Sequence, residues 1–161
     1  MVAAAAPAAQ WTAALRYFGA LAHPGDPDRA RIRWLRGRMV QMPLGEHLAL
    51  VVVPNMAWGM EAARLLVEEC EQHSGPVLLL SVHRQAWFFT TAPRPGTTWA
   101  LPGAPGPVLH TSGTAAMPPP TRDGKTWMWL NAPRAGVLTP PALVQAALTV
   151  AHGALRRNGL V

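Results

Sequence analysis

The chain has 161 residues and a mass of 17.3 kDa, a length that predicts a single domain with its own hydrophobic core. Half of the residues are hydrophobic and 14% are charged, which excludes a wholly disordered chain, and no apolar run reaches the roughly 18 residues of a membrane-spanning helix. The net charge of +6 at pH 7 favours an acidic partner, and the single cysteine, Cys70, excludes an internal disulfide.

The first part of the chain predicts a helix and a hairpin. Residues 1–8 are rich in Ala and Pro, so we expect a disordered tail ahead of a single domain at 9–161. Apolar residues at helical spacing predict a helix over Ala9–Ala22. Arg38–Met42 and His47–Val53 predict two strands, which a turn containing glycine joins as a hairpin.

The clearest helix covers Met56–His73 and begins after Asn55, a residue that is favourable at the N-cap. We expect its solvent face to carry ion pairs at i,i+3 and i,i+4 among Glu61, Arg64, Glu68 and Glu71. The stripe expected to be buried consists of Met56, Met60, Ala63, Val67 and Cys70. The position of Cys70 in this stripe predicts that its thiol is packed rather than reactive.

Short strands and a last helix complete the predicted fold. The strands are expected at Val77–Val82, Ala86–Thr91, Val108–His110, Thr114–Met117 and Lys125–Leu130. Pro141–Arg156 predicts an amphipathic helix whose inward side chains are Leu143, Ala147, Val150 and Leu155. This order predicts an α+β fold, with a mostly antiparallel sheet flanked by helices.

The carboxylates and histidines do not form a recognisable catalytic or metal-binding pattern. The eight Asp and Glu residues lie in turns or on the wet face of a helix, and no two have the placement that a two-metal site needs. The six histidines lack metal-ligand spacing. We therefore expect no metal, no cofactor and no enzymatic activity, and an enzyme using His47, His83 or His110 is the weakest alternative.

The densest run of charge consists of five arginines: Arg29, Arg31, Arg33, Arg36 and Arg38. If Asp28–Leu35 is a strand, Arg29, Arg31 and Arg33 share one face; if it is a helix, Arg29, Arg33 and Arg36 do. Converging guanidinium groups favour phosphate binding, and the alternative is a solvated charged edge. A GC-rich coding bias also contributes arginine, because Lys125 is the only lysine among 14 basic residues.

The second half of the chain is rich in tryptophan. Trp87, Trp99, Trp127 and Trp129 gather there, and the alternation of the last two places them on one face of the sheet. Aromatic side chains near basic residues are able to stack on nucleobases. Packing in the core is the more common role of such residues.

Four segments together resemble a known family: Leu48–Val53, Met56–His73, Val77–Thr91 and Gly113–Trp129. In order and character they resemble the N-terminal domain of bifunctional primase-polymerases, in the archaeo-eukaryotic primase group. The resemblance covers roughly residues 45–130, and its most specific part is Ala115–Thr121 followed by Gly124 and Trp127–Trp129.

The same resemblance argues against catalysis. The family carries acidic metal ligands on two strands, whereas this chain has Val51–Asn55 and Val108–Thr111 at the matching places, without an acid. Phosphoryl transfer of this kind depends on metal-bound carboxylates, so the resemblance implies an inactive relative. It also implies a remnant nucleotide pocket, formed by Ser81, His83, Arg84, Arg122 and Lys125. The family's histidine position corresponds either to His83 or to Trp87.

The function predicted from these observations is a non-catalytic, primase-polymerase-like domain that binds nucleic acid or a nucleotide through the basic run. The alternative is a protein-interaction or regulatory adaptor, whose contact surface would lie around Trp99 and Pro118–Pro120. The N-terminus has no positively charged segment before its apolar residues, so we expect no signal peptide, no membrane partner and a location in the cytoplasm.

Overall fold

The computed structural model describes residues 8–101, 103, 105–120 and 123–161; most of the predicted tail, residues 1–7, lies outside this range. In chain order the elements are α1 (Ala8–Ala22), α2 (Pro27–Leu35), β1 (Val40–Pro43), β2 (Leu48–Val53), α3 (Met56–Cys70) with a 3-10 turn (Glu71–His73), β3 (Val77–Leu80), β4 (Gln85–Thr91), β5 (Val108–His110), β6 (Thr114–Met117), β7 (Trp127–Asn131) and α4 (Pro141–Arg157). None of the helices in this described part is long and apolar enough to cross a membrane.

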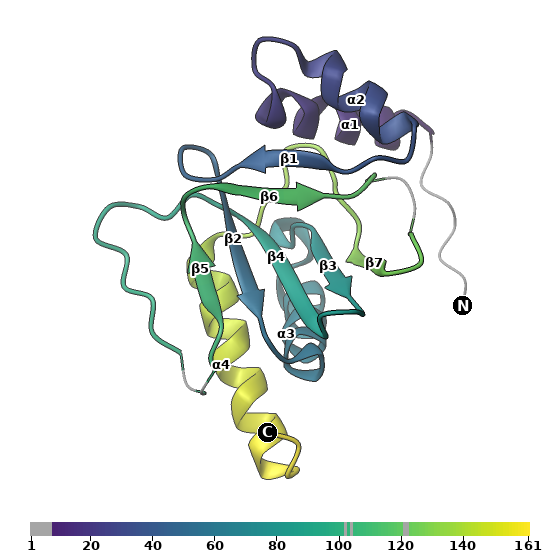
Figure 1. Ribbon diagram of the computed structural model, residues 1–161. Helices are drawn as coiled ribbons and strands as arrows, with labels where there is room; N and C mark the ends of the chain where they lie inside the picture. The colour runs from purple at the N-terminus through teal and green to yellow at the C-terminus, as the bar shows by residue number, and fades with distance from the viewer. Residues whose placement is uncertain (1–7, 102, 104, 121–122) are drawn as a thin grey trace.

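A five-stranded antiparallel sheet in the order β5-β2-β4-β3-β7 forms the centre of the molecule. Helices α3 and α4 cover one face of the sheet (Figure 1). Strand β4 is antiparallel to both β2 and β3 and lies between them, so β2, α3 and β3 form a split βαβ unit. The predicted α+β class is confirmed.

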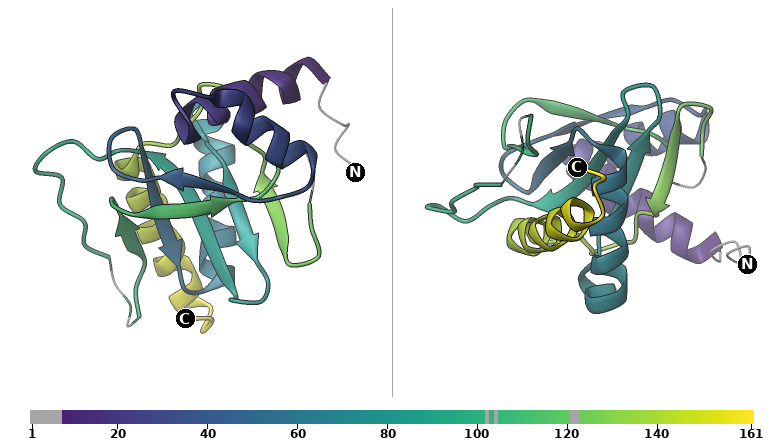
Figure 2. Two further views of the ribbon diagram at one scale, coloured as in Figure 1. Left: turned by 45° about the horizontal axis from the view of Figure 1, so that its top comes forward. Right: turned by 90° about the horizontal axis from the view of Figure 1, so that it is seen from below.

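Strands β1 and β6 form a separate two-stranded ladder under α1 and α2, on the opposite side of the sheet from α3 and α4 (Figures 1 and 2). The prediction that β1 and β2 form a hairpin is wrong, because β1 pairs with β6 and β2 pairs with β4 and β5. The chain turns a corner between β1 and β2, where the Leu44 N–H donates to the Gly113 carbonyl oxygen at 2.9 Å and Gly45 has φ of 133°. This corner directs β2 into the sheet centre, where its almost wholly apolar sequence is buried.

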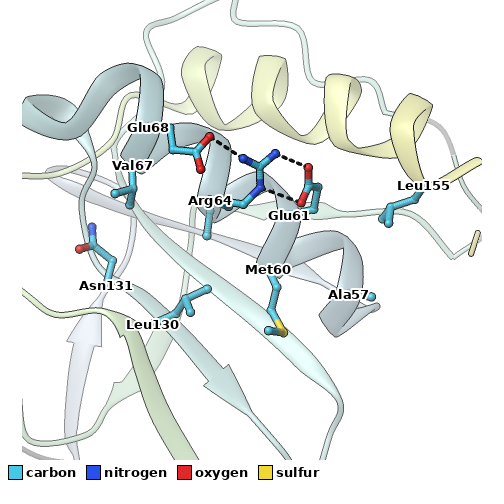
Figure 3. A pocket seen from close by; sticks show the side chains of 10 residues that line it. Ala57, Met60, Glu61, Arg64, Val67, Glu68, Leu130, Asn131 and Leu155 are labelled. Atoms are coloured by element: carbon cyan, nitrogen blue, oxygen red, sulfur yellow. Dashed lines mark hydrogen bonds and ion pairs between the residues drawn. The ribbon is translucent and has the colours of Figure 1, made fainter. Parts of the chain in front are cut away.

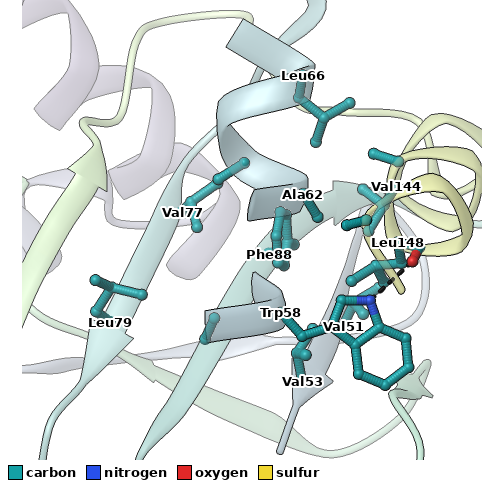
Figure 4. Close-up of a cluster of buried hydrophobic side chains, with 14 of the residues drawn as sticks. Val51, Val53, Trp58, Ala62, Leu66, Val77, Leu79, Phe88, Val144 and Leu148 are labelled. Carbon is teal, nitrogen blue, oxygen red and sulfur yellow. Dashed lines mark hydrogen bonds between the residues drawn. The ribbon is translucent and has the colours of Figure 1, made fainter. Parts of the chain in front are cut away.

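The core between the sheet and helices α3 and α4 contains Trp58, Leu66, Phe88 and Leu148 (Figure 4). The Trp58 indole Nε1 donates to the Leu148 carbonyl oxygen at 2.8 Å, which joins α3 to α4. Helix α3 lies very close to β4, since a Cβ on Gly59 would be 2.2 Å from the Ala86 Cβ. Glycine is the residue that allows such an approach.

The core on the other side of the sheet fixes the position of α2. Phe18, Trp34, Phe89 and Met117 are fully buried there. The Trp34 indole Nε1 donates to the carbonyl oxygen of Met117 at 3.0 Å. The α2 helix is thus held to β6 by both packing and a buried hydrogen bond.

Two predicted apolar stripes are wrong in part. Met60 and Val67 of α3 are 43% and 40% exposed, and Val150 of α4 is 59% exposed. The stripe of α3 that faces the core consists instead of Trp58, Gly59, Ala62, Ala63 and Leu66. Small residues bring this helix close to the sheet, and the larger methionine and valine side chains are left on its outer side.

Candidate nucleic-acid interface

Helix α2 confirms the helical reading of the arginine run. Pro27 occupies the first turn, where its missing N–H costs no hydrogen bond. Ala30 and Trp34 face the core, so the other sides of the helix are open to solvent. The arginines therefore project outward because the two apolar residues determine which side is buried.

The end of α2 brings Arg38 back beside the helix. Gly37 has φ of 73°, and its N–H donates to the Trp34 carbonyl oxygen at 2.9 Å. The Arg38 N–H donates to the Arg33 carbonyl oxygen, also at 2.9 Å. These two bonds define a Schellman motif, in which glycine adopts the left-handed conformation that ends the helix.

Four of the five arginines lie around one shallow pocket of about 300 Å³, which we call the α2 arginine surface: Arg29, Arg33, Arg36 and Arg38. Asp26 and Asp28 also line this pocket, at the N-terminal end of the helix. Arg31 is not part of the surface; one of its guanidinium nitrogens lies 3.3 Å from an oxygen of Asp28.

The four arginines of the α2 arginine surface outnumber the two carboxylates that line the same pocket, Asp26 and Asp28. Within the described residues, none of its four guanidinium groups forms an ion pair. The Arg33 Nε donates to the carbonyl oxygen of Met39 at 3.2 Å, which orients that guanidinium group. Arginine remains charged at any physiological pH, so the surface presents several unpaired cations.

Two of the apolar residues that the sequence places among these arginines have exposed side chains. Ile32 is 46% exposed and Leu35 is 68% exposed. Their exposure follows from the burial of Ala30 and Trp34, because residues on the opposite side of a helix point away from the core. The sequence contains the signal for this exposure, because a helix over Asp28–Leu35 places both residues on the side away from Ala30 and Trp34.

Three of the residues predicted to form a remnant nucleotide pocket, Ser81, His83 and Arg84, lie in the turn between β3 and β4. The Ser81 N–H and hydroxyl both approach the Thr126 carbonyl oxygen, at 3.1 Å and 3.2 Å. This contact brings Ser81 near Lys125, while His83 and Arg84 are exposed in the same turn. Arg122 lies outside the described residues.

Arg84 has a backbone conformation that is unusual for arginine. Its φ is 53°, and its N–H donates to the Ser81 carbonyl oxygen at 3.3 Å to close the turn. A residue other than Gly, Asn or Asp in this left-handed region is disfavoured by contact between its Cβ and the carbonyl oxygen. The turn thus holds an exposed guanidinium group at a cost in backbone energy.

The tryptophans near this turn lie on the face of the sheet opposite α3 and α4. Trp127 and Trp129 both pack against the core under α1 and α2, which confirms their predicted common face. Gly124 lies against the Trp127 ring, since a Cβ there would be 2.3 Å from a ring atom. The Trp87 indole Nε1 donates to Gln85 Oε1 at 3.1 Å, and its ring is half-buried.

The strands at which the resemblance would place acids, β2 and β5, lie side by side. Val52 is opposite Val108, and Leu50 is opposite His110. Asn55 caps α3, with its Oδ1 accepting from the Trp58 N–H at 3.0 Å. In the part of the chain that the structure describes, no three His, Cys, Asp or Glu residues are grouped to hold a metal ion.

The histidines considered for catalysis do not gather in one place. His47 precedes β2 and His110 ends β5, at the corner where these strands lead into the β1–β6 ladder. His83 lies in the turn between β3 and β4, which is at the opposite end of the sheet because β4 is antiparallel to β2.

The structure differs from the surface that the sequence suggests for a protein partner. Pro118, Pro119 and Pro120 are buried, so the expectation that they form an exposed contact surface is wrong. Trp99 is half-buried, and its indole Nε1 donates to the Pro107 carbonyl oxygen at 3.1 Å. The prolines are covered because the chain between β6 and β7 packs against Trp129, whose Nε1 donates to the Pro119 carbonyl oxygen at 2.9 Å.

The two groups of predicted site residues lie apart in the structure. Helix α2 lies at the top of the view in Figure 1, and the turn between β3 and β4 lies toward the bottom. No residue of that turn lines the pocket of the α2 arginine surface. Comparisons with protein-family models, with curated proteins and with solved structures found no match.

Proposed function

We propose that the chain is a non-catalytic, primase-polymerase-like domain that binds nucleic acid through the α2 arginine surface. The observation that carries this proposal is the set of unpaired guanidinium groups around one shallow pocket. Guanidinium groups form bidentate hydrogen bonds with phosphate, and several on one surface suit a repeating phosphate backbone. The net charge of +6 adds a long-range attraction to such a polyanion.

The primase-polymerase part of the proposal rests on the order of the elements. The segments that carry the resemblance form β2, α3, the β3–β4 pair, β6 and β7. Val52 and Val108 stand on neighbouring strands where acids would have to converge on a metal. Apolar side chains at these positions support a binding role without metal-dependent phosphoryl transfer.

A second part of the proposal concerns the turn at Ser81–Arg84. With Lys125 nearby, this turn offers a hydroxyl, an imidazole and two cations to a nucleotide phosphate. Because it is separate from α2, substitutions in the two sites should change nucleotide binding and nucleic-acid binding independently.

The nucleic-acid proposal is tested by fluorescence anisotropy with labelled single-stranded and double-stranded oligonucleotides at low and moderate salt. We expect binding at low salt, and a marked loss of affinity in the double variant Arg33→Gln/Arg36→Gln. The double variant Arg156→Gln/Arg157→Gln removes the same charge from the end of α4 and should bind nearly as wild type. Absence of binding to every oligonucleotide at low salt would refute the proposal.

A further inference from the structure

A groove of about 590 Å³ runs along the outer side of α3 (Figure 3). Met60, Val67 and Leu130 supply apolar surface to this groove. Glu61, Arg64 and Glu68 line it as well. We call it the α3 groove; it combines exposed apolar side chains with carboxylates.

Two of the chain's eight carboxylates, Glu61 and Glu68, line this groove. Four of the eight Asp and Glu residues belong to α3 and the turn that follows it: Glu61, Glu68, Glu69 and Glu71. Arg64 is the cation among them, with one Nη 2.6 Å from Glu61 and the other paired with Glu68. The hydrogen bond from Arg64 lowers the pKa of Glu61, so this carboxylate stays ionised at neutral pH.

The α2 helix and the α3 groove differ in charge, because the groove carries two carboxylates, Glu61 and Glu68, against one cation, Arg64, whereas the pocket on α2 has an excess of arginines. Ile32 and Leu35 give it exposed apolar side chains, and the α2 arginine surface gives it unpaired cations. A strongly basic protein with a localised acidic patch offers a second copy of itself an electrostatically complementary site. The exposed apolar residues on both surfaces add area that association would remove from water.

We propose that copies of this chain associate head to tail, with α2 of one copy docked in the α3 groove of the next. Ile32 and Leu35 pack against Met60, Val67 and Leu130, and the arginines of α2 bind Glu61 and Glu68. Helices α2 and α3 lie on opposite sides of the sheet, so one copy is able to use both surfaces at once (Figure 2). Such a heterologous contact builds a closed ring or an open chain.

Head-to-tail association places the same α2 helix in two competing interactions. This competition rests on the proposed function. If α2 binds nucleic acid, then nucleic acid and the α3 groove of another copy exclude each other at the α2 arginine surface. Binding of an oligonucleotide should then dissociate the assemblies, and assembly should lower the apparent affinity for the oligonucleotide.

Sedimentation velocity of the full chain, from low micromolar to near-millimolar concentration, tests the association. We expect the average mass to rise with concentration at low salt and to fall when salt is added. The variant Glu68→Arg, which we call groove-blocked, should weaken association roughly tenfold or more, because it places a like charge opposite α2. Glu46→Arg makes the same charge change at a site that is 88% exposed at the corner before β2, and it should associate as wild type.

A second variant blocks the other surface. Ile32→Ser/Leu35→Ser, which we call α2-blocked, keeps every arginine and should also associate more weakly than wild type. Leu160→Ser removes a side chain of similar exposure near the C-terminus and should have no effect on association. Thermal unfolding of each variant checks that the fold is retained.

Mixing the two blocked variants gives the decisive result. At a concentration where each variant alone is monomeric, the two together still have one intact α2 helix and one intact α3 groove, so the mixture should form mixed dimers and no larger particles. A monomeric wild type at all concentrations, or a mixture of blocked variants that stays monomeric, would overturn the proposal. If oligonucleotides do not bind, the proposed function is refuted. If they bind but do not dissociate the assemblies, the competition is refuted. Neither result contradicts head-to-tail association.

Discussion

Gly37 determines where the α2 arginine surface ends. With φ of 73°, it allows the chain to reverse after α2 and brings Arg38 back to the Arg33 carbonyl oxygen. The sequence identifies the arginines, but the position of Arg38 depends on this one left-handed residue. A single backbone conformation therefore adds the fourth cation to the surface.

Substitution of Gly37 tests this role. Gly37→Ala should destabilise the chain by about 1 kcal/mol, the cost of placing a Cβ in the left-handed region. It should also weaken oligonucleotide binding, because Arg38 is displaced. Gly25→Ala is the control, since its Cβ would meet nothing within 4 Å. Equal midpoints of urea unfolding for Gly37→Ala and wild type would contradict the expectation.

Arg84 is the other residue at which backbone conformation bears on the proposed function. Its φ of 53° predicts that Arg84→Gly raises the free energy of unfolding by roughly 0.5–1 kcal/mol, through relief of the left-handed strain. The same change should weaken nucleotide binding, because it removes a cation from the turn.

Urea unfolding measures the change in stability of Arg84→Gly, and isothermal calorimetry with a nucleoside triphosphate measures the change in nucleotide binding. Arg94→Gly, which removes an exposed arginine from the loop after β4, should give neither gain in stability nor loss of binding. A variant of Arg84 that is more stable and binds equally well would show that the strained arginine has no part in binding.

The elements themselves were predicted well wherever local signals decide them. Asn55 at the N-cap identifies the start of α3, and its capping hydrogen bond is present. The side of a helix that faces the core was harder to predict, because Met60 and Val67 have apolar side chains but lie on the outer side of α3. Close packing of Gly59 on β4 decided the orientation, and that contact joins residues far apart in the sequence.

Gly59 gives a prediction for the contact between α3 and the sheet. Gly59→Ala should destabilise the chain by about 1–3 kcal/mol, because its Cβ would lie 2.2 Å from the Ala86 Cβ. Addition of Ala86→Gly should recover part of the loss, which a double-mutant cycle measures. Gly153→Ala on α4, where the nearest atom lies 3.6 Å away, should be neutral or stabilising. Two similar losses for Gly59→Ala and Gly153→Ala would contradict the packing argument.

The pairing of strands was less predictable than their existence. Residues 40–43 and 48–53 are close in sequence and read as a hairpin, but each finds its partners more than thirty residues away. The apolar area that becomes buried decides which strands pair. Because β2 is apolar on both faces, it buries most of this area in the centre of the sheet. Local turn signals do not contain that information.

At the scale of the whole molecule, the densest group of arginines and the densest group of glutamates lie on opposite sides of the sheet. The arginines of α2 lie on one side and the glutamates of α3 on the other (Figures 1 and 2). Composition reveals only the sum of +6, and the linear sequence does not reveal whether the arginine run meets the Ser81–Arg84 turn. The fold separates these two groups of residues, and we propose the α2 arginine surface as the one that binds a polyanion.

The salt dependence of oligonucleotide binding tests the α2 arginine surface most directly. The logarithm of the binding constant should fall linearly with the logarithm of the salt concentration. In Arg33→Gln/Arg36→Gln the slope should become shallower by about 2, because two phosphate contacts are lost. In Arg156→Gln/Arg157→Gln the slope should stay at its wild-type value. Identical slopes for all three proteins would contradict phosphate binding by α2.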